Sequence, residues 1–311
     1  MVNGATSWSS AVVTTPAPHP YSDVIYGTWR LLDDPEGAEP ASLASRLALC
    51  ADLGITTVDT AEIYGGYRVE QHIGAALQHS PGLRDRLQII TKCGIYAPAP
   101  GQPERRVAYY DATARRIVQS VEQSLRLLGT DRIDLLLVHR PDWLTSAADT
   151  AAGLEQVLRD GKVLQVGVSN YSVEQYLTLQ ALMSHKLVTN QIELSMFHSD
   201  PVVDGTIARF DGLRVRPMAW SPLAGGRLFR TEDDAARRVQ SACRDLAPTY
   251  GEASSEALAL AWILALPGRP HVVLGTNKLD RIRRAAAAPA LHLAREDWFL
   301  LTEAARGEKI P

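Results

Sequence analysis

A short run rich in β-branched residues ends on an aspartate in the stretch Thr56-Thr57-Val58-Asp59-Thr60-Ala61-Glu62-Ile63-Tyr64-Gly65. Tyr64 follows this aspartate by five residues and stands next to a glycine, which is typical of a loop. A carboxylate at the end of a buried strand is costly unless a nearby group uses its charge. The stretch therefore predicts a strand that brings an acid and a tyrosine to one site, together with a cation from elsewhere in the chain.

A strand followed by a helix recurs eight times along the chain. The predicted strands are short apolar or β-branched runs at 24–26, 56–58, 87–91, 133–138, 163–168, 187–192, 213–219 and 271–274. Segments with helical character follow at 41–52, 69–78, 113–128, 150–159, 173–183, 204–210, 234–250 with 255–266, and 280–288. Eight such units without a break in composition predict an α/β protein with one (β/α)8 TIM barrel. An open doubly wound sheet is the alternative, but no Gly-rich G-x-G-x-x-G turn follows the first strand.

The N-terminal segment differs from the rest of the chain. Residues 1–22 are rich in Ser, Thr, Ala and Pro without a period, which predicts a flexible N-terminal arm or, as the alternative, a short hairpin under the barrel. Residues 23–311 are assigned to the single barrel domain, with 97–102 as a long loop over its mouth and a charged tail after the last helix. Two smaller domains would need a linker, and the segment 97–102 comes too early in the chain to serve as one.

The composition argues against several classes of protein. A net charge of −3 gives no reason to expect nucleic acid or an anionic membrane as partner. No apolar run approaches the roughly 20 residues that span a bilayer, and the N-terminus lacks the pattern of a signal peptide. Cys50, Cys93 and Cys243 are widely spaced, so we expect reduced thiols, no metal site and a cytoplasmic protein.

In a barrel of this kind the chemistry lies at the carboxyl ends of the strands. Polar or aromatic side chains follow almost every predicted strand, namely Asp59 with Tyr64, Lys92, His139, Ser169 with Asn170, Gln191, Trp220 with Ser221, and Gly275-Thr276-Asn277-Lys278. Taken singly, each has an ordinary explanation, such as a helix cap, a surface lysine, a core histidine or loop packing. Their coincidence at one rim predicts an active site.

Four of these residues together suit a general acid. Lys92 beside the Tyr64 hydroxyl favours the phenolate and is expected to lower the pKa of the phenol from about 10. Asp59 keeps the lysine charged and oriented, and His139 can bind a substrate oxygen or share the proton. An acid of this kind protonates an oxygen on which charge develops, which suits the reduction of a carbonyl when a hydride donor lies beside it.

The neighbouring strand ends suit that hydride donor. Ser169, Asn170 and Gln191 offer donors and acceptors that can hold a carboxamide. Trp220 offers a flat face on which an aromatic ring can stack. A carboxamide on a flat ring describes nicotinamide, so the rim predicts a nicotinamide cofactor.

The chain resembles the aldo-keto reductases from about Ile25 to Trp298. The motifs that carry this resemblance are Gly27-Thr28-Trp29, Asp59-Thr60-Ala61-Glu62-Ile63-Tyr64-Gly65, Ile90-Thr91-Lys92, Leu137-Val138-His139-Arg140-Pro141-Asp142, Gly167-Val168-Ser169-Asn170, Asn190-Gln191, Trp220-Ser221-Pro222-Leu223 and Gly275-Thr276-Asn277-Lys278. The runs Tyr64-Gly65-Gly66-Tyr67 and Arg216-Pro217-Met218-Ala219-Trp220-Ser221 are similar to a bacterial subgroup of predicted oxidoreductases.

The resemblance implies a role for each matching residue. Tyr64 is the general acid, Lys92 and Asp59 tune it, and His139 orients the carbonyl. The residues implied at the cofactor are Thr28 and Trp29 at the nicotinamide end, Ser169, Asn170 and Gln191 on the carboxamide, Trp220 under the ring, Ser221, Leu223, Gly225 and Arg227 along the pyrophosphate, and Gly275, Thr276, Asn277, Lys278 and Arg281 around the adenosine ribose and its 2′-phosphate.

The expected cofactor is NADPH, with NADH less favoured. Gly275-Thr276 stands where members with strong NADPH sites often carry a Lys-Ser pair, which weakens the expected grip on the phosphate. Lys278 and Arg281 nevertheless bring two cations to this place, and a phosphate binds cations. A helix N-terminus near Asp280 adds its dipole, although the aspartate itself opposes it.

The resemblance implies an oxidoreductase that reduces an aldehyde or ketone to an alcohol. It also implies a small-molecule carbonyl substrate, a class that includes specialised metabolites. Trp29, Tyr96, Trp143, Phe197 and His198 lie in loops that can face the pocket, so we expect an apolar or aromatic substrate. Three alternatives remain open: reduction of an imine on the same scaffold, a non-catalytic NADPH-binding regulatory subunit, and a Schiff-base lyase or aldolase with Lys92 as nucleophile. The last is disfavoured because Asp59 would keep the lysine charged.

Overall fold

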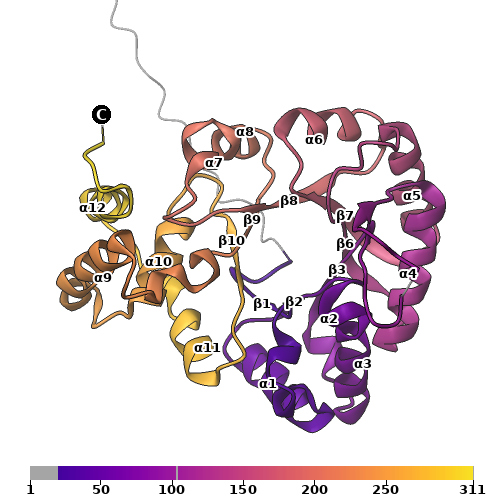
Figure 1. Ribbon diagram of the computed structural model, residues 1–311, viewed down its shortest axis with the longest axis horizontal. Helices are drawn as coiled ribbons and strands as arrows, with labels where there is room; N and C mark the ends of the chain where they lie inside the picture. The colour runs from indigo at the N-terminus through magenta and orange to yellow at the C-terminus, as the bar shows by residue number, and fades with distance from the viewer. Residues whose placement is uncertain (1–19, 103, 311) are drawn as a thin grey trace, which may run out of the picture.

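Eight parallel strands close into a barrel in the computed structural model, which describes residues 20–102 and 104–310. The predicted (β/α)8 fold is therefore confirmed (Figure 1). Around the ring the strands are β1 (Val24–Gly27), β10 (His271–Leu274), β9 (Met218–Trp220), β8 (Leu187–Glu193), β7 (Val163–Ser169), β6 (Ile133–Val138), β3 (Gln88–Cys93) and β2 (Thr57–Asp59), which pairs again with β1.

A helix follows each barrel strand and covers its outer face. These helices are α1 (Pro40–Asp52), α3 (Val69–His79), α4 (Ala114–Leu128), α5 (Ala147–Arg159), α6 (Val173–Gln180), α8 (Thr206–Gly212), α10 (Ser255–Leu264) and α11 (Leu279–Ala286). Their boundaries follow local chemistry. Thr113 caps α4 by accepting a hydrogen bond from the backbone N–H of Arg116 at 3.3 Å, and Gly129, with a φ of 62°, ends it in the left-handed region.

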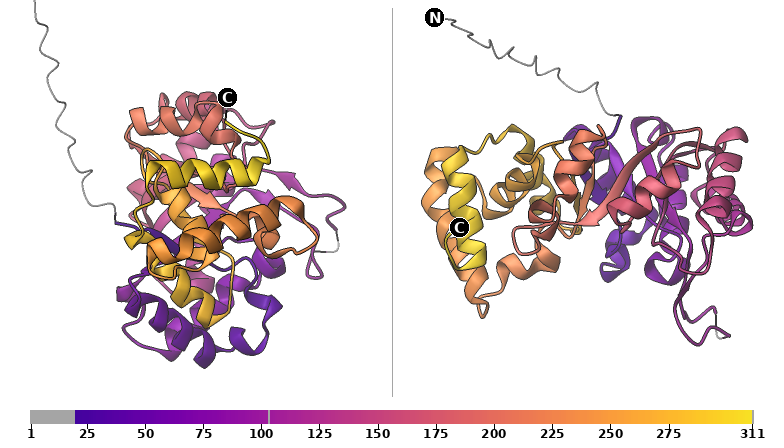
Figure 2. Two further views of the ribbon diagram at one scale, coloured as in Figure 1. Left: turned by 90° about the vertical axis from the view of Figure 1, so that its left-hand side faces the viewer. Right: turned by 90° about the horizontal axis from the view of Figure 1, so that it is seen from above.

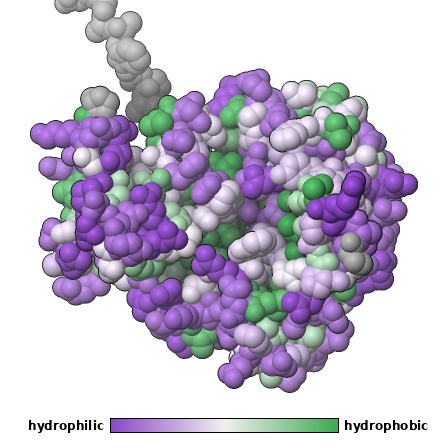
Figure 3. Space-filling model, viewed as in Figure 1, coloured by the Kyte–Doolittle hydropathy of each residue, from purple (hydrophilic) through white to green (hydrophobic). Residues whose placement is uncertain are grey.

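The strand register brings the predicted rim residues to one end of the barrel. Asp59 pairs with Gly27 on one side and with Ile90 on the other, and Ser169 pairs with Gln191. All neighbouring strands in the ring are parallel, so their carboxyl ends, and the side chains that follow them, gather at the same mouth. Figure 3 shows a hollow near the centre of this view, with apolar residues among those around it.

The opposite end of the barrel is closed by the residues that precede β1. Tyr21 is buried, and its hydroxyl lies within hydrogen-bond distance of the backbone oxygen of Asp134, at 3.2 Å, and of the side-chain oxygen of Gln165, at 2.5 Å. Asp23 forms ion pairs with Arg216 at 2.5 Å and Arg269 at 2.8 Å. Residues 1–19 of the predicted N-terminal arm lie outside the described residues, but Tyr21, also assigned to that arm, is bound to the barrel.

Two boundary predictions at the C-terminal half were wrong. The predicted strand 213–219 is shortened to β9 because α8 ends at Gly212 and Arg214 turns into the left-handed region at a φ of 52°. The predicted charged tail contains the helix α12 (Arg295–Arg306), which packs against α9 (Asp234–Leu246) outside the ring (Figure 1). The ring of Trp298 in α12 stacks on the ring of Trp262 with centroids 4.9 Å apart, so an aromatic anchor holds this charged helix in place.

The segment after β3 forms a hairpin in addition to a loop. β4 (Ile95–Tyr96) pairs antiparallel with β5 (Tyr109–Tyr110), and the chain between them projects well clear of the barrel (Figure 2). Shorter elements also lie between the barrel units, among them α2 (Tyr64–Tyr67), α7 (Asp200–Val203) and the 3-10 segment η4 (Ala224–Phe229).

Candidate active site

Lys92 is the centre of the site, and its side chain is completely buried. Its ammonium donates to Asp59 Oδ2 at 2.7 Å, to the backbone oxygen of Thr60 at 2.9 Å and to the Tyr64 hydroxyl at 2.9 Å. Burial opposes the charge of this lysine, but Asp59 and Tyr64 outweigh burial and raise its pKa above the ordinary value. A charged amine is a poor nucleophile, so this arrangement disfavours a Schiff-base role for Lys92.

Tyr64 points its hydroxyl at this ammonium and is itself buried. Burial raises the pKa of its phenol, and the positive charge of Lys92 lowers it only in part, so the net direction is upward. The expected lowering of this pKa was therefore wrong, because the cost of burying a phenolate exceeds the gain from one ammonium. The consequence for catalysis is favourable, since the phenol keeps its proton and can donate it.

His139 completes the group, with its ring centroid 5.9 Å from that of Tyr64. Burial lowers the pKa of this histidine well below its ordinary value, and the charges of Lys92 and Arg140 lower it further. The imidazole is therefore neutral at neutral pH. We call Asp59, Tyr64, Lys92 and His139, the four residues predicted to be catalytic, the catalytic corner.

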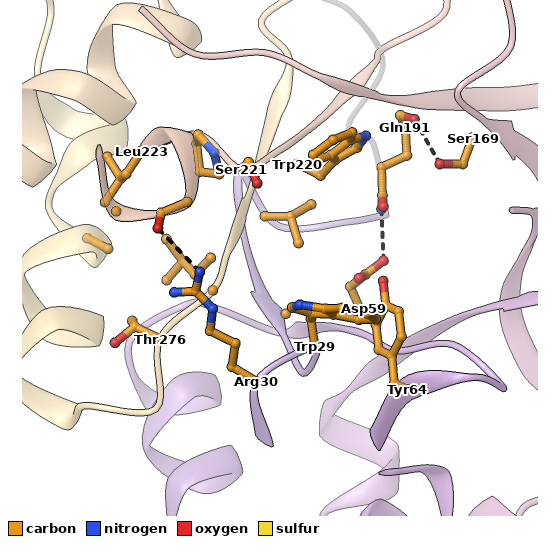
Figure 4. A pocket seen from close by; sticks show the side chains of 18 of the residues that line it. Trp29, Arg30, Asp59, Tyr64, Ser169, Gln191, Trp220, Ser221, Leu223 and Thr276 are labelled. Atoms are coloured by element: carbon orange, nitrogen blue, oxygen red, sulfur yellow. Dashed lines mark hydrogen bonds between the residues drawn. The ribbon is translucent and has the colours of Figure 1, made fainter. Parts of the chain in front are cut away.

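The residues expected to hold a carboxamide are bonded to one another. Gln191 donates from Nε2 to Asp59 Oδ1 at 2.8 Å, and its backbone oxygen accepts from Ser169 Oγ at 2.9 Å. Asn170 donates to Ser169 Oγ at 2.8 Å and accepts from the indole N–H of Trp220 at 2.9 Å. Figure 4 shows Trp220 and Gln191 on one side of the cavity and Trp29 and Tyr64 facing them.

A cavity of about 450 Å³ opens beside the catalytic corner. Of the cofactor residues expected from sequence, eleven line it, namely Trp29, Ser169, Asn170, Gln191, Trp220, Ser221, Leu223, Gly225, Gly275, Thr276 and Arg281. Four others do not, namely Thr28, Arg227, Asn277 and Lys278. Thr28 is buried behind the wall, where its hydroxyl donates to the backbone oxygen of Asp59 at 2.9 Å.

Arg227 and Asn277 are turned to protein partners. The guanidinium of Arg227 pairs with Asp233 at 2.5 Å and lies over the ring of Phe197 at 4.9 Å. Asn277 accepts from the Tyr26 hydroxyl at 3.0 Å and donates to the backbone oxygen of Arg30 at 2.6 Å. Neither side chain therefore lines the cavity.

Of the five residues expected in the substrate pocket, only Trp29 lines the cavity. Tyr96 lies under the guanidiniums of Arg105 and Arg116 at 4.4 and 4.2 Å, and Trp143 is 84% exposed outside the cavity. Phe197 lies under Arg227, as described above, and the backbone of His198 pairs with that of Ser195. Four of the five residues expected in the substrate pocket therefore do not line this cavity.

Two arginines that line the cavity escaped the sequence analysis. Arg30 reaches across from the segment after β1 and donates to the backbone oxygen of Gly225 at 3.3 Å (Figure 4). Arg140 lines the cavity beside His139 and forms no ion pair or hydrogen bond with the described residues. Arg30 directly follows the motif residue Trp29, and Arg140 follows His139 within the same motif, and this adjacency was the available signal.

The opposite part of the cavity, which we call the outer end, is lined by Phe229, Glu256, Gly275, Thr276, Arg281 and Ala285. Arg281 lies over the ring of Phe229 at 5.3 Å and has no carboxylate partner among the described residues. Glu256 is neutralised by Arg284 at 3.0 Å. Between the outer end and the catalytic corner, Ser221, Ala224, Gly225 and Gly226 all have positive φ values.

This chemistry fits a dinucleotide. Arg30 and Arg281 are cations that suit phosphate groups, and a Cβ built on Gly225 meets no atom closer than the Arg30 guanidinium at 4.0 Å, so the loop leaves space there.

Across the part of the chain that the structure describes, no group of three His, Cys, Asp or Glu side chains is placed to hold a metal ion. Within the same residues, no helix has the length and apolar character needed to cross a membrane.

Comparisons with known proteins agree with this geometry. The model of the Aldo/keto reductase family matches residues 23–306. The chain is 45% identical over 289 residues to the 6-dehydroglucose reductase of Agrobacterium fabrum, covering 93% of this chain and 96% of that protein. It is 40% identical over 291 residues to the oxidoreductase YdhF of Escherichia coli, covering 94% and 96%. An aldo/keto reductase from Klebsiella pneumoniae, solved in complex with NADP and acetate, shares the fold with a TM-score of 0.73 at 24% identity over 94% of this chain and 93% of that one.

Proposed function

The chain belongs to the aldo/keto reductase family and is an NAD(P)H-dependent oxidoreductase, and on this premise we propose that it reduces an aldehyde or ketone with NADPH, using Tyr64 as the general acid. The observation that carries this proposal is the buried Lys92 ammonium, which binds Asp59 at 2.7 Å and the Tyr64 hydroxyl at 2.9 Å.

In this mechanism the substrate carbonyl lies against Tyr64 and the neutral His139. The bound nicotinamide would supply the hydride to the carbonyl carbon. As negative charge develops on the carbonyl oxygen, the Tyr64 phenol transfers its proton to that oxygen, and the Lys92 ammonium stabilises the resulting phenolate. Asp59 keeps the ammonium in place, and the phenolate regains its proton from solvent before the next turnover.

The preference for NADPH over NADH rests on the outer end of the cavity. Arg281 has no carboxylate partner there, and the only acid that lines this end, Glu256, is already paired with Arg284. A 2′-phosphate would therefore meet a cation without opposition from a free carboxylate. The likeness to a fold relative solved with NADP supports the same preference.

The substrate that we propose is a small carbonyl compound rich in oxygen. Arg140 is partly buried beside His139, and a guanidinium in such a place favours hydroxyl or carboxylate oxygens over an apolar group. The name of the Agrobacterium fabrum relative, 6-dehydroglucose reductase, supports an aldehyde that carries hydroxyl groups. This replaces the apolar substrate expected from the sequence.

A panel of carbonyl compounds with NADPH tests this function. We expect turnover to the alcohol, with hydroxyaldehydes preferred over aliphatic aldehydes of the same length. We expect Tyr64→Phe to lose this turnover. Arg140→Met should remove the preference and leave the rate on the aliphatic aldehydes unchanged. Equal turnover by Tyr64→Phe would exclude the acid role, while tight NADPH binding without turnover on any compound would favour a non-catalytic NADPH-binding module.

A further inference from the structure

The turn that carries Tyr64 holds an unusual backbone. Gly65, Gly66 and Tyr67 follow one another in the left-handed region, with φ values of 58°, 66° and 70°. Glycine accepts this conformation readily, but a residue with a bulky side chain pays about 1–2 kcal/mol for it. A strained residue of this kind persists only where its surroundings hold it, so the contacts of Tyr67 explain its conformation.

The hydroxyl of Tyr67 binds the hairpin that follows β3. It accepts from the backbone N–H of Ala97 at 2.7 Å and from Arg105 Nη1 at 2.7 Å, and donates to the backbone oxygen of Ala97 at 3.3 Å. The Arg105 guanidinium also lies 5.1 Å from the centre of the Tyr67 ring and 4.4 Å from that of Tyr96. One hydroxyl and one arginine thus join the turn to both ends of the projecting segment.

The other flank of Tyr64 is tied to the same hairpin. Glu62 stands two residues before Tyr64 and accepts from the backbone N–H of Gly94 at 2.9 Å. The same carboxylate pairs with Arg116 in α4 at 2.7 Å, and Arg116 lies 4.2 Å from the centre of the Tyr96 ring. The acid-bearing turn is therefore bound to the hairpin on both sides of Tyr64.

The hairpin also forms part of the cavity. Ile95, the first residue of β4, is buried and lines the cavity near the catalytic corner. Displacement of the hairpin would move this wall and, through Tyr67 and Glu62, the backbone that aims the Tyr64 hydroxyl at Lys92. A shift of about 1 Å in a catalytic group can lower a rate about a hundredfold.

We propose that Tyr67 and Arg105 are positioning residues: they latch the β4–β5 hairpin to the turn of the general acid, fixing the Tyr64 hydroxyl on Lys92 and the Ile95 wall on the substrate. This inference rests on the proposed role of Tyr64. Neither residue touches the cavity, so the latch acts on the chemical step and on the substrate, and leaves the outer end of the cavity unchanged.

The test compares Tyr67→Phe and Arg105→Met with the matched control Arg106→Met. Arg106 is the next residue, carries the same charge, is exposed and has no hydrogen bond or cation–π contact with Tyr67 among the described residues. We expect each latch variant to lower kcat about tenfold and to leave the Kd of NADPH unchanged, whereas Arg106→Met keeps the wild-type values. The double variant should lose less than the two single losses combined, because both changes break the hydrogen bond between Arg105 and Tyr67, although each also removes a contact of its own with Ala97 or Tyr96.

Two further readouts separate positioning from a general loss of structure. In the latch variants the pH at which kcat/KM falls on the alkaline side should shift, because the Tyr64 phenol no longer lies on the Lys92 ammonium, and Arg105→Lys should restore part of kcat. Latch variants that match Arg106→Met in kcat and in pH profile would overturn the proposal. If Tyr64→Phe also kept full turnover, the proposed function would fail as well, so the two failures are distinguishable.

Discussion

The two ends of the cavity are built on different principles. In the catalytic corner Lys92 and Asp59 are buried, and each charge is held by a partner supplied by the protein at 2.7–2.9 Å. At the outer end Arg281 lies over Phe229 and has no carboxylate partner among the described residues. The charges of the corner are paired before any ligand arrives, whereas the outer end presents charge that a ligand must balance. The protein thus preorganises the catalytic geometry, whereas the charge at the outer end is balanced only when the dinucleotide binds.

The largest effect should come from removing the cation of the catalytic corner. Lys92→Met leaves the Asp59 carboxylate buried with only Gln191 as a partner, and breaking a buried ion pair on one side costs about 3 kcal/mol or more. We expect the free energy of unfolding, measured in denaturant, to fall by that amount and turnover to be lost. The control is Lys162→Met, because Lys162 forms its ion pair with Glu122 at the surface, and its loss should be barely measurable. Equal stability of both variants would contradict the buried pair.

A smaller and more selective effect should come from the outer end. Arg281→Met removes a guanidinium from the place proposed for the 2′-phosphate, and the loss of one charge-assisted hydrogen bond is worth about 1.5–3 kcal/mol. We therefore expect the Kd of NADPH to rise at least about tenfold, while the Kd of NADH stays unchanged. Fluorescence titration measures both. Arg283→Met is the matched control, because Arg283 is exposed on the same helix and does not line the cavity. An equal rise in the Kd of NADPH and in the Kd of NADH would contradict the assignment.

The smallest expected effect is that of pH on the reaction rate. The proposed acid must be protonated, and burial raises the pKa of Tyr64 above its ordinary value of 10.0. The carbonyl-binding histidine must be neutral, and the pKa of His139 lies well below its ordinary value of 6.5. The logarithm of kcat/KM for the carbonyl should thus be flat between pH 6.5 and pH 10. A decline near neutral pH would show that one of these two groups changes its charge there.

The sequence predicted the barrel and the catalytic corner because both depend on strand ends. Asp59, Lys92 and His139 each stand at or directly after a barrel strand, and parallel register brings such positions together whatever the loops do. The direction of the Tyr64 pKa was missed, because burial of the phenol is a property of the packed site and the sequence displays only the neighbouring cation. The charged helix α12 was missed because its anchor, Trp298 on Trp262, joins segments that are distant in the chain.

The substrate side was predicted less well for a physical reason. Tyr96, Trp143, Phe197 and His198 lie outside the barrel strands, in the β4–β5 hairpin or in loops, and a side chain there turns toward whichever partner the fold offers. Two arginines draw Tyr96 away from the cavity, and Arg227 covers Phe197. Arg30 and Arg140 line the cavity instead, and their adjacency to Trp29 and His139 was the available signal.

The most direct test measures the rate of reduction at the catalytic corner and the binding of NADPH at the outer end in one variant. Tyr64→Phe keeps the ring and its contact with Trp29 and removes only the hydroxyl on Lys92. With NADPH bound in advance, the single-turnover rate of carbonyl reduction should fall about a thousandfold, as expected for loss of a general acid, while the Kd of NADPH stays at the wild-type value. An unchanged rate would contradict this account. A fall in the rate together with a rise in the Kd of NADPH would also contradict a preorganised acid that works independently of the outer end.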